Sequence, residues 1–407
     1  MNQTRKPRFF YGYFVALAAF LIMGVAFGTL YTFGIFFEHV SEEFGWSRTL
    51  TSGAFSLYMV LHGLLYIIVG RLTDRLGPRL VITVCGLFLG LGYLLMSQIS
   101  AVWQLYLFYG VMVAIGMSAF FVPLSSTVAR WFVKRRGLMT GIVLAGIGVG
   151  TMLMPPLASW LISTYDWQTS YIIVGSIALV IIIAAAQLLR RDPGQMGQLP
   201  YGANEIDDQS INLGSGGFSL PEAIHTRQFW LLCAIFLLCL FSIQTIMVHV
   251  VIYATGLGIS PTTAASILTI IGGLSIPGRI VMGSITDRVG DKLALITSLV
   301  LLSLSLFWFG VAREVWMLCL IAAIFGFAYG GSLAVMSPLV AHLFGLDSLG
   351  IILGIITFSG TIGGAIGPLV AGYIFDTTDS YQLAFSVCGA ISIIAIILAI
   401  LLNKHFF

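Results

Sequence analysis

One arginine lies in a stretch that is otherwise apolar. Arg279 belongs to GGLSIPGRIVMG, residues 272–283, and the apolar segment around it, residues 262–284, contains no Lys, Asp or Glu. A guanidinium keeps its charge at physiological pH and presents a planar fork of N–H donors that matches a carboxylate. Because its own segment offers no acidic partner, Arg279 predicts a binding site for an anion, and its geometry favours a small carboxylate.

The elements that must position Arg279 are long apolar helices. Hydrophobic residues make up 58% and charged residues 9% of the 407 residues, whereas about a quarter of residues are charged in soluble domains. An apolar helix of roughly 20 residues crosses a bilayer, in which an unpaired backbone is too costly. The sequence predicts an all-α membrane protein with twelve spans, near residues 10–37, 49–69, 80–97, 103–128, 138–162, 169–189, 229–255, 262–284, 293–311, 316–343, 349–375 and 383–402.

Basic residues outside these spans favour one side of the membrane. Twelve spans put sixteen of the nineteen Lys and Arg on the side of the termini and of segment 191–227, and leave Arg48 and Arg313 on the other side. The positive-inside rule then predicts cytoplasmic termini and a place in the cell inner or plasma membrane.

The basic start leads into a full span without a cleavage pattern, so we expect the first helix to be retained. The net charge of +3 follows from topology and does not indicate nucleic acid.

The chain consists of two halves that repeat. The polar segment 191–227 separates two six-span halves, 1–190 and 228–407, and GRLTDRLGPR at 70–79 returns as GSITDRVGDK at 283–292. A shift of 213 residues relates Gly70, Asp74, Arg75, Gly137, Gly141, Gly150 and Pro155 to Gly283, Asp287, Arg288, Gly350, Gly354, Gly363 and Pro368. Because six is even, both halves have the same orientation in the membrane. This is the parallel-repeat arrangement of transporters whose halves rock about a central site.

These motifs resemble the major facilitator superfamily along the whole chain. The loop G-x-x-x-D-R-x-G-x-[RK], found here after the second and eighth spans, is that superfamily's hallmark. In that family its carboxylate caps a neighbouring helix N-terminus and pairs with arginine, as a cytoplasmic latch between the halves, and both contacts are physically favourable. The resemblance implies a gating role for Gly70, Asp74, Arg75, Gly283, Asp287 and Arg288. The alternative is a solvated turn without this role.

Arg279 carries a narrower resemblance. An arginine at this place in the eighth span resembles the substrate-binding residue of the monocarboxylate transporters, and oxalate/formate exchangers carry a similar one. ARWFVKRRGLMTGIVLAGIGVG, residues 129–150, is similar to the fifth-span signature of the monocarboxylate transporters, and YGYFVALAAF, residues 11–20, matches their first-span signature more weakly. The resemblance implies a carrier that moves a small monocarboxylate such as L-lactate or pyruvate together with a proton, by alternating access.

Arg279 has a second interpretation, in which it only snorkels to the membrane surface. It lies eight residues before Asp287, which is about 12 Å along a helix. Pro277 and Gly278 can loosen the helix beside it and free carbonyls toward a cavity. A pathway role is favoured over snorkelling by the stripe of small, weakly polar residues on its helical face, Gly272, Ser275 and Gly283.

Two positions depart from the animal monocarboxylate transporters. Tyr31 takes the place of a first-span lysine and Ser275 that of an aspartate, and both family residues are tied to proton coupling. His249 is the favoured titratable candidate, because a neutral imidazole is cheap to bury and gains a proton at about pH 6–7. A hydrogen-bonded packing role for His249 is the alternative, and His62 in the second span is a weaker candidate.

The rest of the predicted pocket is apolar and aromatic. Its candidate lining residues, each of which could instead be core packing, are Tyr31, Phe120, Leu144, Tyr329 and Phe358. A dicarboxylate needs two cations in a dry cavity, and the eleventh span has no charged residue between Asp347 and Asp376. The pattern therefore favours one carboxylate per substrate over the oxalate/formate type of exchange.

Other function classes have little support in the sequence. The spans contain no H-E-x-x-H motif, carboxylate pair or Ser–His pattern, so we expect no catalytic residue and no enzyme. The five cysteines follow no recurring spacing, which argues against disulfides and a metal site. We expect no cofactor, and as partners a small carboxylate, a proton and the bilayer, with the monomer as the functional unit. A non-transporting carboxylate sensor of the same shape is the remaining alternative, whereas paired gating loops disfavour an open channel.

Overall fold

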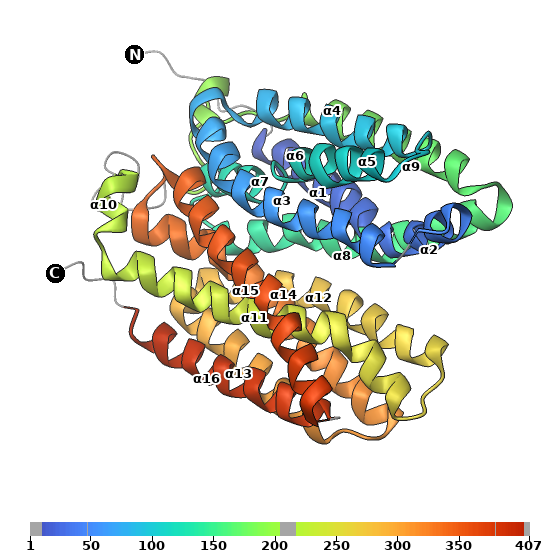
Figure 1. Cartoon of the computed structure of the whole chain (residues 1–407). Coiled ribbons are helices and arrows are strands. Elements are labelled where there is room, and N and C mark those ends of the chain that lie inside the picture. Colours follow the sequence, from blue (N-terminus) through green and yellow to red (C-terminus); the bar gives the residue numbers. More distant parts are fainter. Residues whose placement is uncertain (1–9, 47, 204–216, 379, 403–407) are drawn as a thin grey trace, which may run out of the picture.

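The computed structural model describes residues 10–46, 48–203, 217–378 and 380–402. Within these ranges twelve helical segments are long and apolar enough to cross a membrane, which confirms the predicted all-α, twelve-span architecture. The segments form two bundles that lie side by side, the N-terminal one blue to green and the C-terminal one yellow to red in Figure 1. The spans are Gly12–Phe36, Gly53–Leu76, Pro78–Met96, Val102–Trp131, Arg136–Thr164, Trp167–Ala186, Arg227–Gly256, Ser266–Val289, Asp291–Val311, Val315–Phe344, Leu349–Phe375 and Tyr381–Ile400.

Two spans of the N-terminal bundle are interrupted. The first breaks at Tyr31 and Thr32, where the hydroxyl of Thr32 donates to the Thr29 carbonyl at 2.7 Å and so competes with the helical backbone. The fourth breaks before Pro123, which lacks a backbone N–H. The helices are α1 Gly12–Leu30, α2 Phe33–Phe44, α3 Arg48–Leu76, α4 Pro78–Met96, α5 Val102–Leu105, the π-helix η1 Tyr106–Val113, α6 Ala114–Met117, α7 Val122–Trp131, α8 Arg136–Thr164 and α9 Trp167–Ala186.

Among the described residues, the C-terminal bundle consists of six unbroken helices. Thr226 and Ser260 begin the first two of them by accepting hydrogen bonds from the backbone N–H of Phe229 and Thr263, which satisfies donors that have no partner within the helix. The helices are α11 Arg227–Gly256, α12 Pro261–Val289, α13 Asp291–Val311, α14 Val315–Phe344, α15 Leu349–Thr378 and α16 Tyr381–Ile400.

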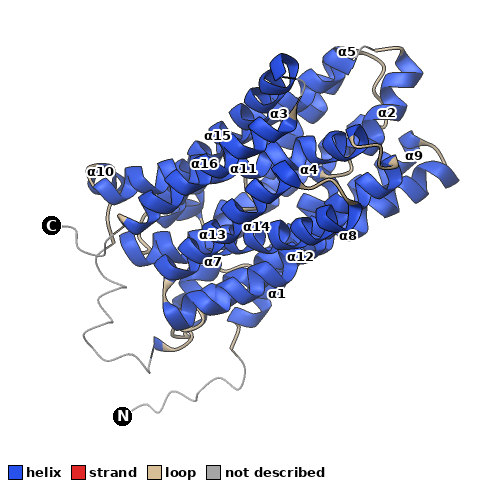
Figure 2. Cartoon of the chain, turned by 90° about the horizontal axis from the view of Figure 1, so that it is seen from below, coloured by secondary structure: helices blue, strands red, loops and turns tan. Residues whose placement is uncertain are grey.

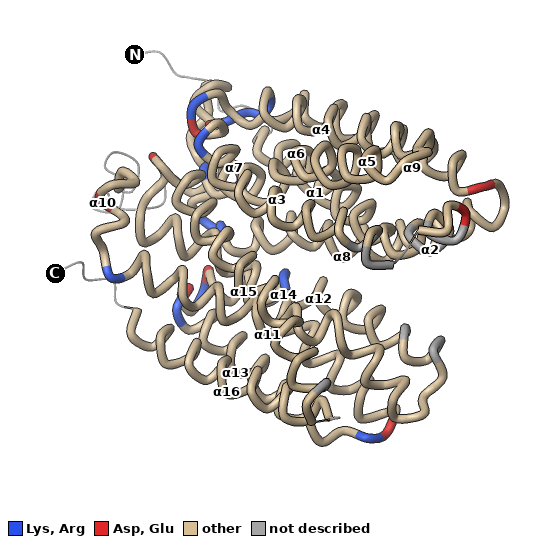
Figure 3. The backbone as a smooth tube through the Cα atoms, in the orientation of Figure 1, with Lys and Arg blue, Asp and Glu red and all other residues tan. Residues whose placement is uncertain are grey.

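The described parts of the linker pack on opposite bundles. The first part contains the 3₁₀-helix η2 Pro193–Met196, and its Tyr201 N–H donates to the Trp131 carbonyl at 2.9 Å. The last part contains α10 Leu220–Ile224, where the Glu222 carboxylate accepts hydrogen bonds from Ser219 that hold the pKa of this carboxyl below its usual value. α1 begins and α16 ends on the side of the linker, so we call this side the linker end and the opposite side the distal end. Figure 3 shows that the Lys and Arg residues gather at the linker end.

The bundles meet where helices cross at glycines. α8 packs on α12 and α3 on α15, and the first pair lies side by side in both Figure 1 and Figure 2. A Cβ atom added to Gly137 or Gly283 would lie 2.3 Å from the carbonyl oxygen of the other residue. A Cβ atom added to Gly70 would lie 2.4 Å from the Gly350 carbonyl oxygen. The repeated glycines therefore let each half approach the other, in two crossings that the 213-residue shift relates.

Candidate functional site

Described residues of both bundles line two neighbouring cavities between them. The larger measures about 430 Å³ and includes Arg279 in its wall, so we call it the Arg279 cavity. The smaller measures about 140 Å³ and includes His62, so we call it the His62 cavity. Both cavities are lined by Tyr31, Ile147 and Tyr329, which makes them two parts of one central chamber.

Arg279 is almost completely buried, and Ser275 orients its guanidinium. Only 1% of the arginine is exposed, and its Nη1 donates to the Ser275 Oγ at 2.6 Å. The Ser275 hydroxyl donates in turn to the Gly272 carbonyl at 2.6 Å, so its lone pairs face the guanidinium. The guanidinium carbon lies 5.3 Å from the centre of the Tyr329 ring, within the range of a cation–π contact.

No anion balances this charge within the described part of the chain. The side chains that act on Arg279 electrostatically are Tyr329 and Tyr31, and it joins none of the ion pairs among the described residues. Its Nε, although buried, has no hydrogen-bond partner. A buried donor without a partner is costly, more so on a charged group. Among the described residues, the buried guanidinium thus lacks both a counterion and a partner for one of its donors.

The local backbone explains how a long side chain fits at this point. Gly148 of α8 faces the guanidinium, and a Cβ atom there would lie 3.2 Å from the Arg279 Nη1. The hydrogen bond to Ser275, one turn earlier in α12, directs the side chain toward the distal end. This direction is opposite to the one that snorkelling to the linker end requires.

The Arg279 cavity extends toward the distal end. Beyond Arg279 and Ser275, its wall includes Thr151 and Ser159 in the distal half of α8 and Leu268 in the distal half of α12. At the linker end, the glycine crossings of α8 with α12 and of α3 with α15 bring the bundles into backbone contact. In this conformation, access to Arg279 is from the distal end.

The predicted aromatic and apolar candidates divide into two groups. Tyr31, at the break between α1 and α2, and Tyr329 line both cavities. Phe120 and Leu144 are fully buried in the core and, like Phe358, line neither cavity. The structure thus brings Tyr31 and Tyr329 to Arg279 and leaves the other three outside the chamber.

Neighbours of these three residues line the chamber instead. Ile147 lies one turn beyond Leu144, Phe121 follows Phe120 at the break before α7, and Thr357 and Thr361 flank Phe358 on α15. Counting residues along a span predicts how deep a residue lies in the membrane. It does not predict which face of the helix points into the chamber. A further signal was available for α15, because Thr361 is the repeat equivalent of Gly148, the residue beside Arg279.

The two candidate histidines, His249 and His62, have different surroundings. His249 on α11 lines neither cavity, and its Nδ1 and Nε2 lie 3.1 Å from the Tyr381 hydroxyl and 3.0 Å from the Pro368 carbonyl oxygen. Both ring nitrogens are therefore used within the C-terminal bundle, as the packing interpretation expects. His62 lines the smaller cavity, where its buried Nε2 has no partner.

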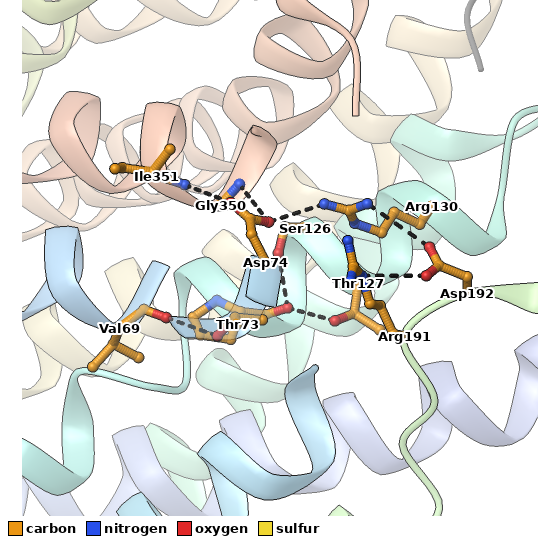
Figure 4. A network of polar contacts seen from close by, with 11 residues as sticks. Val69, Thr73, Asp74, Ser126, Thr127, Arg130, Arg191, Asp192, Gly350 and Ile351 are labelled. Atoms are coloured by element: carbon orange, nitrogen blue, oxygen red, sulfur yellow. Dashed lines mark hydrogen bonds and ion pairs between the residues drawn. The ribbon is translucent and has the colours of Figure 1, made fainter. Parts of the chain in front are cut away.

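Asp74 joins the two bundles at the linker end (Figure 4). Its carboxylate accepts hydrogen bonds from the backbone N–H groups of Gly350 at 3.2 Å and Ile351 at 3.0 Å, at the start of α15. The same carboxylate pairs with Arg130 at 2.9 Å, and Arg130 lies 3.8 Å from Asp192. A carboxylate at a helix N-terminus is stabilised by the helix dipole.

Asp287 makes the equivalent contact from the other half. Its two carboxylate oxygens accept hydrogen bonds from the backbone N–H groups of Gly137 at 2.7 Å and Leu138 at 2.8 Å, at the start of α8. Gly137 and Gly350 are repeat equivalents, so the two contacts are related by the 213-residue shift. Arg75 and Arg288 are exposed and join no ion pair within the described ranges.

Known proteins resemble this chain along most of its length. The sequence profile of the Major Facilitator Superfamily matches residues 18–281 and 231–405. Monocarboxylate transporter 13 of Rattus norvegicus is 28% identical over 403 residues, which cover 96% of this chain and 88% of the relative. An uncharacterized MFS-type transporter, YhjX, of Escherichia coli K12 is 26% identical over 353 residues, which cover 86% of this chain and 85% of the relative.

Solved structures support the same fold. The human organic anion transporter MFSD10 superposes with a TM-score of 0.74 at 15% identity, covering 97% of this chain and all of that one. The Escherichia coli fucose:proton symporter FucP gives a TM-score of 0.75 at 15% identity, covering 97% of this chain and 99% of that one. The chain therefore belongs to the major facilitator superfamily, as a membrane transporter related to the monocarboxylate transporters and not an enzyme.

Proposed function

We propose that this protein carries a small monocarboxylate, such as L-lactate or pyruvate, across the cell inner or plasma membrane together with a proton. The observation that carries the proposal is Arg279, a buried guanidinium in the wall of a 430 Å³ cavity, with a neutral serine as its hydrogen-bond partner. A charged residue inside a membrane usually lines a pathway or binds a ligand. The similarity to proteins named monocarboxylate transporters favours a carboxylate as that ligand.

The number of cations favours one carboxylate over two. Arg279 is the one Lys or Arg among the described residues that line either cavity, and the remaining wall is formed mainly by apolar, aromatic and hydroxyl side chains. A second carboxylate would be buried without a partner, which is strongly unfavourable. This supports a monocarboxylate carrier rather than an exchanger of the oxalate/formate type.

Transport proceeds by alternating access. The positive-inside rule assigns the linker end to the cytoplasm, so the conformation described above is open to the outside and latched toward the cytoplasm. A carboxylate enters from the distal end, pairs with Arg279 and neutralises its charge. The bundles then separate at the Asp74 and Asp287 contacts and close at the distal end.

The test is uptake of radiolabelled L-lactate and pyruvate into proteoliposomes whose outside is more acidic than their inside. We expect Arg279→Ala to abolish uptake and Arg279→Lys to reduce it at least tenfold, because an ammonium lacks the bidentate fork. Asp166→Asn, at the distal start of α9, is the control for folding and reconstitution. Wild-type rates in both Arg279 variants would overturn the site, and an unsubstituted protein that transports no monocarboxylate would overturn the function.

A further inference from the structure

His62 is a buried polar group of the chamber that the binding of a carboxylate to Arg279 leaves unused. It lies on α3, 7% exposed, and its Nε2 has no hydrogen-bond partner. The ring is held between Tyr58 and Tyr66, one turn away on either side, with centroids 5.1 Å and 4.3 Å from its own. A buried imidazole nitrogen without a partner loses a hydrogen bond that water would supply in the unfolded chain.

The position of the hydrogen on the His62 ring determines whether Nε2 can accept a proton. The backbone of Met117 acts electrostatically on the His62 ring, and Nε2 has no hydrogen-bond partner. In the tautomer with its hydrogen on Nδ1, the neutral ring presents the lone pair of Nε2 as a proton acceptor. His62 is therefore poised as a proton acceptor, in contrast to His249, whose two nitrogens are both used.

The repeat puts His62 opposite the carboxylate-binding group. His62 and Tyr66 on α3 are separated by 213 residues from Ser275 and Arg279 on α12. A Cβ atom on Gly354 would lie 2.7 Å from the Tyr66 carbonyl oxygen, just as one on Gly141 would lie 2.1 Å from the Arg279 carbonyl oxygen. The pair His62 and Tyr66 thus holds the same position in its half as the pair Ser275 and Arg279 holds in the other.

The two positions are linked through the shared tyrosines. Tyr31 lines both cavities and interacts electrostatically with Arg279, Tyr329 and Tyr66. The titratable or charged groups that line the cavities around His62 are Tyr58 and Tyr66 from α3, Tyr31 from the end of α1, Tyr329 from α14 and Arg279 from α12. α11 and α15 contribute Gln244, Thr357 and Thr361, and no carboxylate lines either cavity within the described residues.

We propose that His62 receives the proton that accompanies the carboxylate, at Nε2, and returns it on the opposite side of the membrane. This inference rests on the proposed function. Without substrate, the guanidinium of Arg279 opposes a second positive charge in the same chamber. A bound carboxylate neutralises Arg279 and gives the protonated Nε2 an acceptor. The proton therefore binds more tightly when the anion is bound, and the anion binds more tightly when His62 is protonated. This mutual dependence is the requirement for coupling.

The charges balance over the cycle. The empty site carries the single positive charge of Arg279, and the loaded site carries Arg279, one carboxylate and one protonated imidazole, which again sum to one positive charge. The proton enters from the distal side, forms an N–H bond at Nε2 and leaves as that bond breaks at the cytoplasmic side. Because both reorienting states have the same charge, transport of the pair is electroneutral.

The experiment separates coupling from binding by comparing two assays of radiolabelled L-lactate in proteoliposomes. We expect His62→Gln to lose accumulation driven by a pH gradient at least tenfold and to keep counterflow at equal pH within threefold of the unsubstituted protein, since exchange needs no net proton transfer. His225→Gln, an exposed residue of the linker, is the matched control. Accumulation by His62→Gln at the control rate would overturn the proposal.

A fold defect and a failure of the proposed function give different results. Loss of both assays by His62→Gln, with an unchanged melting temperature, would identify His62 as a binding group and overturn its role as the proton site. If His62→Gln does not fold, the same assays are made with His62→Asn. The stabilisation of the unsubstituted protein by L-lactate is then measured at pH 5.5 and 8.0, and equal stabilisation at both would contradict the proposal. Absence of counterflow in the unsubstituted protein would instead refute monocarboxylate transport.

Discussion

At the scale of single residues, the neutral partner of Arg279 decides how strongly the site attracts an anion. Ser275 orients the guanidinium through one hydrogen bond of 2.6 Å and leaves its full charge for a ligand. An acidic residue at this position would pair with Arg279 permanently, because the two positions are one helical turn apart on the same face. The substrate would then compete with an internal carboxylate.

This comparison predicts the effect of Ser275→Asp. We expect the variant to raise the KM for L-lactate about tenfold or more, since a hydrogen bond to a charged group contributes about 1.5–3 kcal/mol and the substrate must displace it. Ser275→Ala, which removes the partner without adding a charge, is the matched control. Concentration-dependent counterflow in proteoliposomes measures both, and a KM for Ser275→Asp at or below that of Ser275→Ala would contradict the explanation.

Sequence reasoning predicted Arg279, Tyr31 and Tyr329, which line the central chamber, but missed the faces of the other lining residues. A charge in an apolar segment stands out without any structure, because its burial is costly. Phe120 could not be assigned correctly in the same way, because the π-helix η1 and the break before α7 change the register of the fourth span. Burying an apolar residue carries no such cost on either face of a helix that lies between two bundles. The sequence therefore does not tell whether Leu144 or Ile147 lines the chamber until the packing is known.

At the scale of elements, the crossing of α8 and α12 depends on residues without side chains. A Cβ atom on Gly283 would lie 2.3 Å from the Gly137 carbonyl oxygen, closer than such atoms approach in proteins. A Cβ atom on Gly273, in the same helix, would meet no other atom within 4 Å, so close packing does not require a glycine there. The two glycines differ in what they contact, although both interrupt an apolar helix.

These surroundings predict opposite outcomes for two alanine substitutions in α12. Gly283→Ala is expected to lower the melting temperature and the transport rate, since forcing an extra carbon into a packed interface costs about 1–3 kcal/mol. Gly273→Ala is expected to keep both or to raise the melting temperature, because alanine favours a helix by about 1 kcal/mol over glycine. Thermal unfolding in detergent measures the melting temperature of each variant, and L-lactate counterflow measures its transport rate. Equal effects of the two substitutions would refute the close contact between Gly283 and Gly137 as the cause.

At the scale of the whole molecule, the two latches at the linker end are similar but not equal. The repeat in the sequence predicted both loops, and each carboxylate contacts the helix that begins in the opposite half. The sequence repeat could not reveal the difference between them. Asp74 also pairs with the largely buried Arg130, whose repeat equivalent is Leu343, an apolar residue that offers no such contact.

This asymmetry predicts that the two latches differ in strength. Asp74→Asn and Asp287→Asn both weaken the contacts with a helix N-terminus, but Asp74→Asn also removes a charge-assisted hydrogen bond, which contributes about 1.5–3 kcal/mol. We therefore expect Asp74→Asn to open the linker end about tenfold more often than Asp287→Asn does. Ser337 reports this opening, because it is 2% exposed and its hydroxyl donates to the Ser125 carbonyl of the other bundle at 3.3 Å.

The measurement is the alkylation rate of Ser337→Cys in a protein whose five native cysteines are replaced by serine or alanine. The matched control is Asp166→Asn, because that carboxylate also caps a helix but does so within one bundle at the distal end. We expect the rate to rise in the order control, Asp287→Asn, Asp74→Asn. Equal rates in the last two variants would mean that the Arg130 pair adds nothing to the closed state, and an unchanged rate in both would mean that the carboxylates do not hold the bundles together.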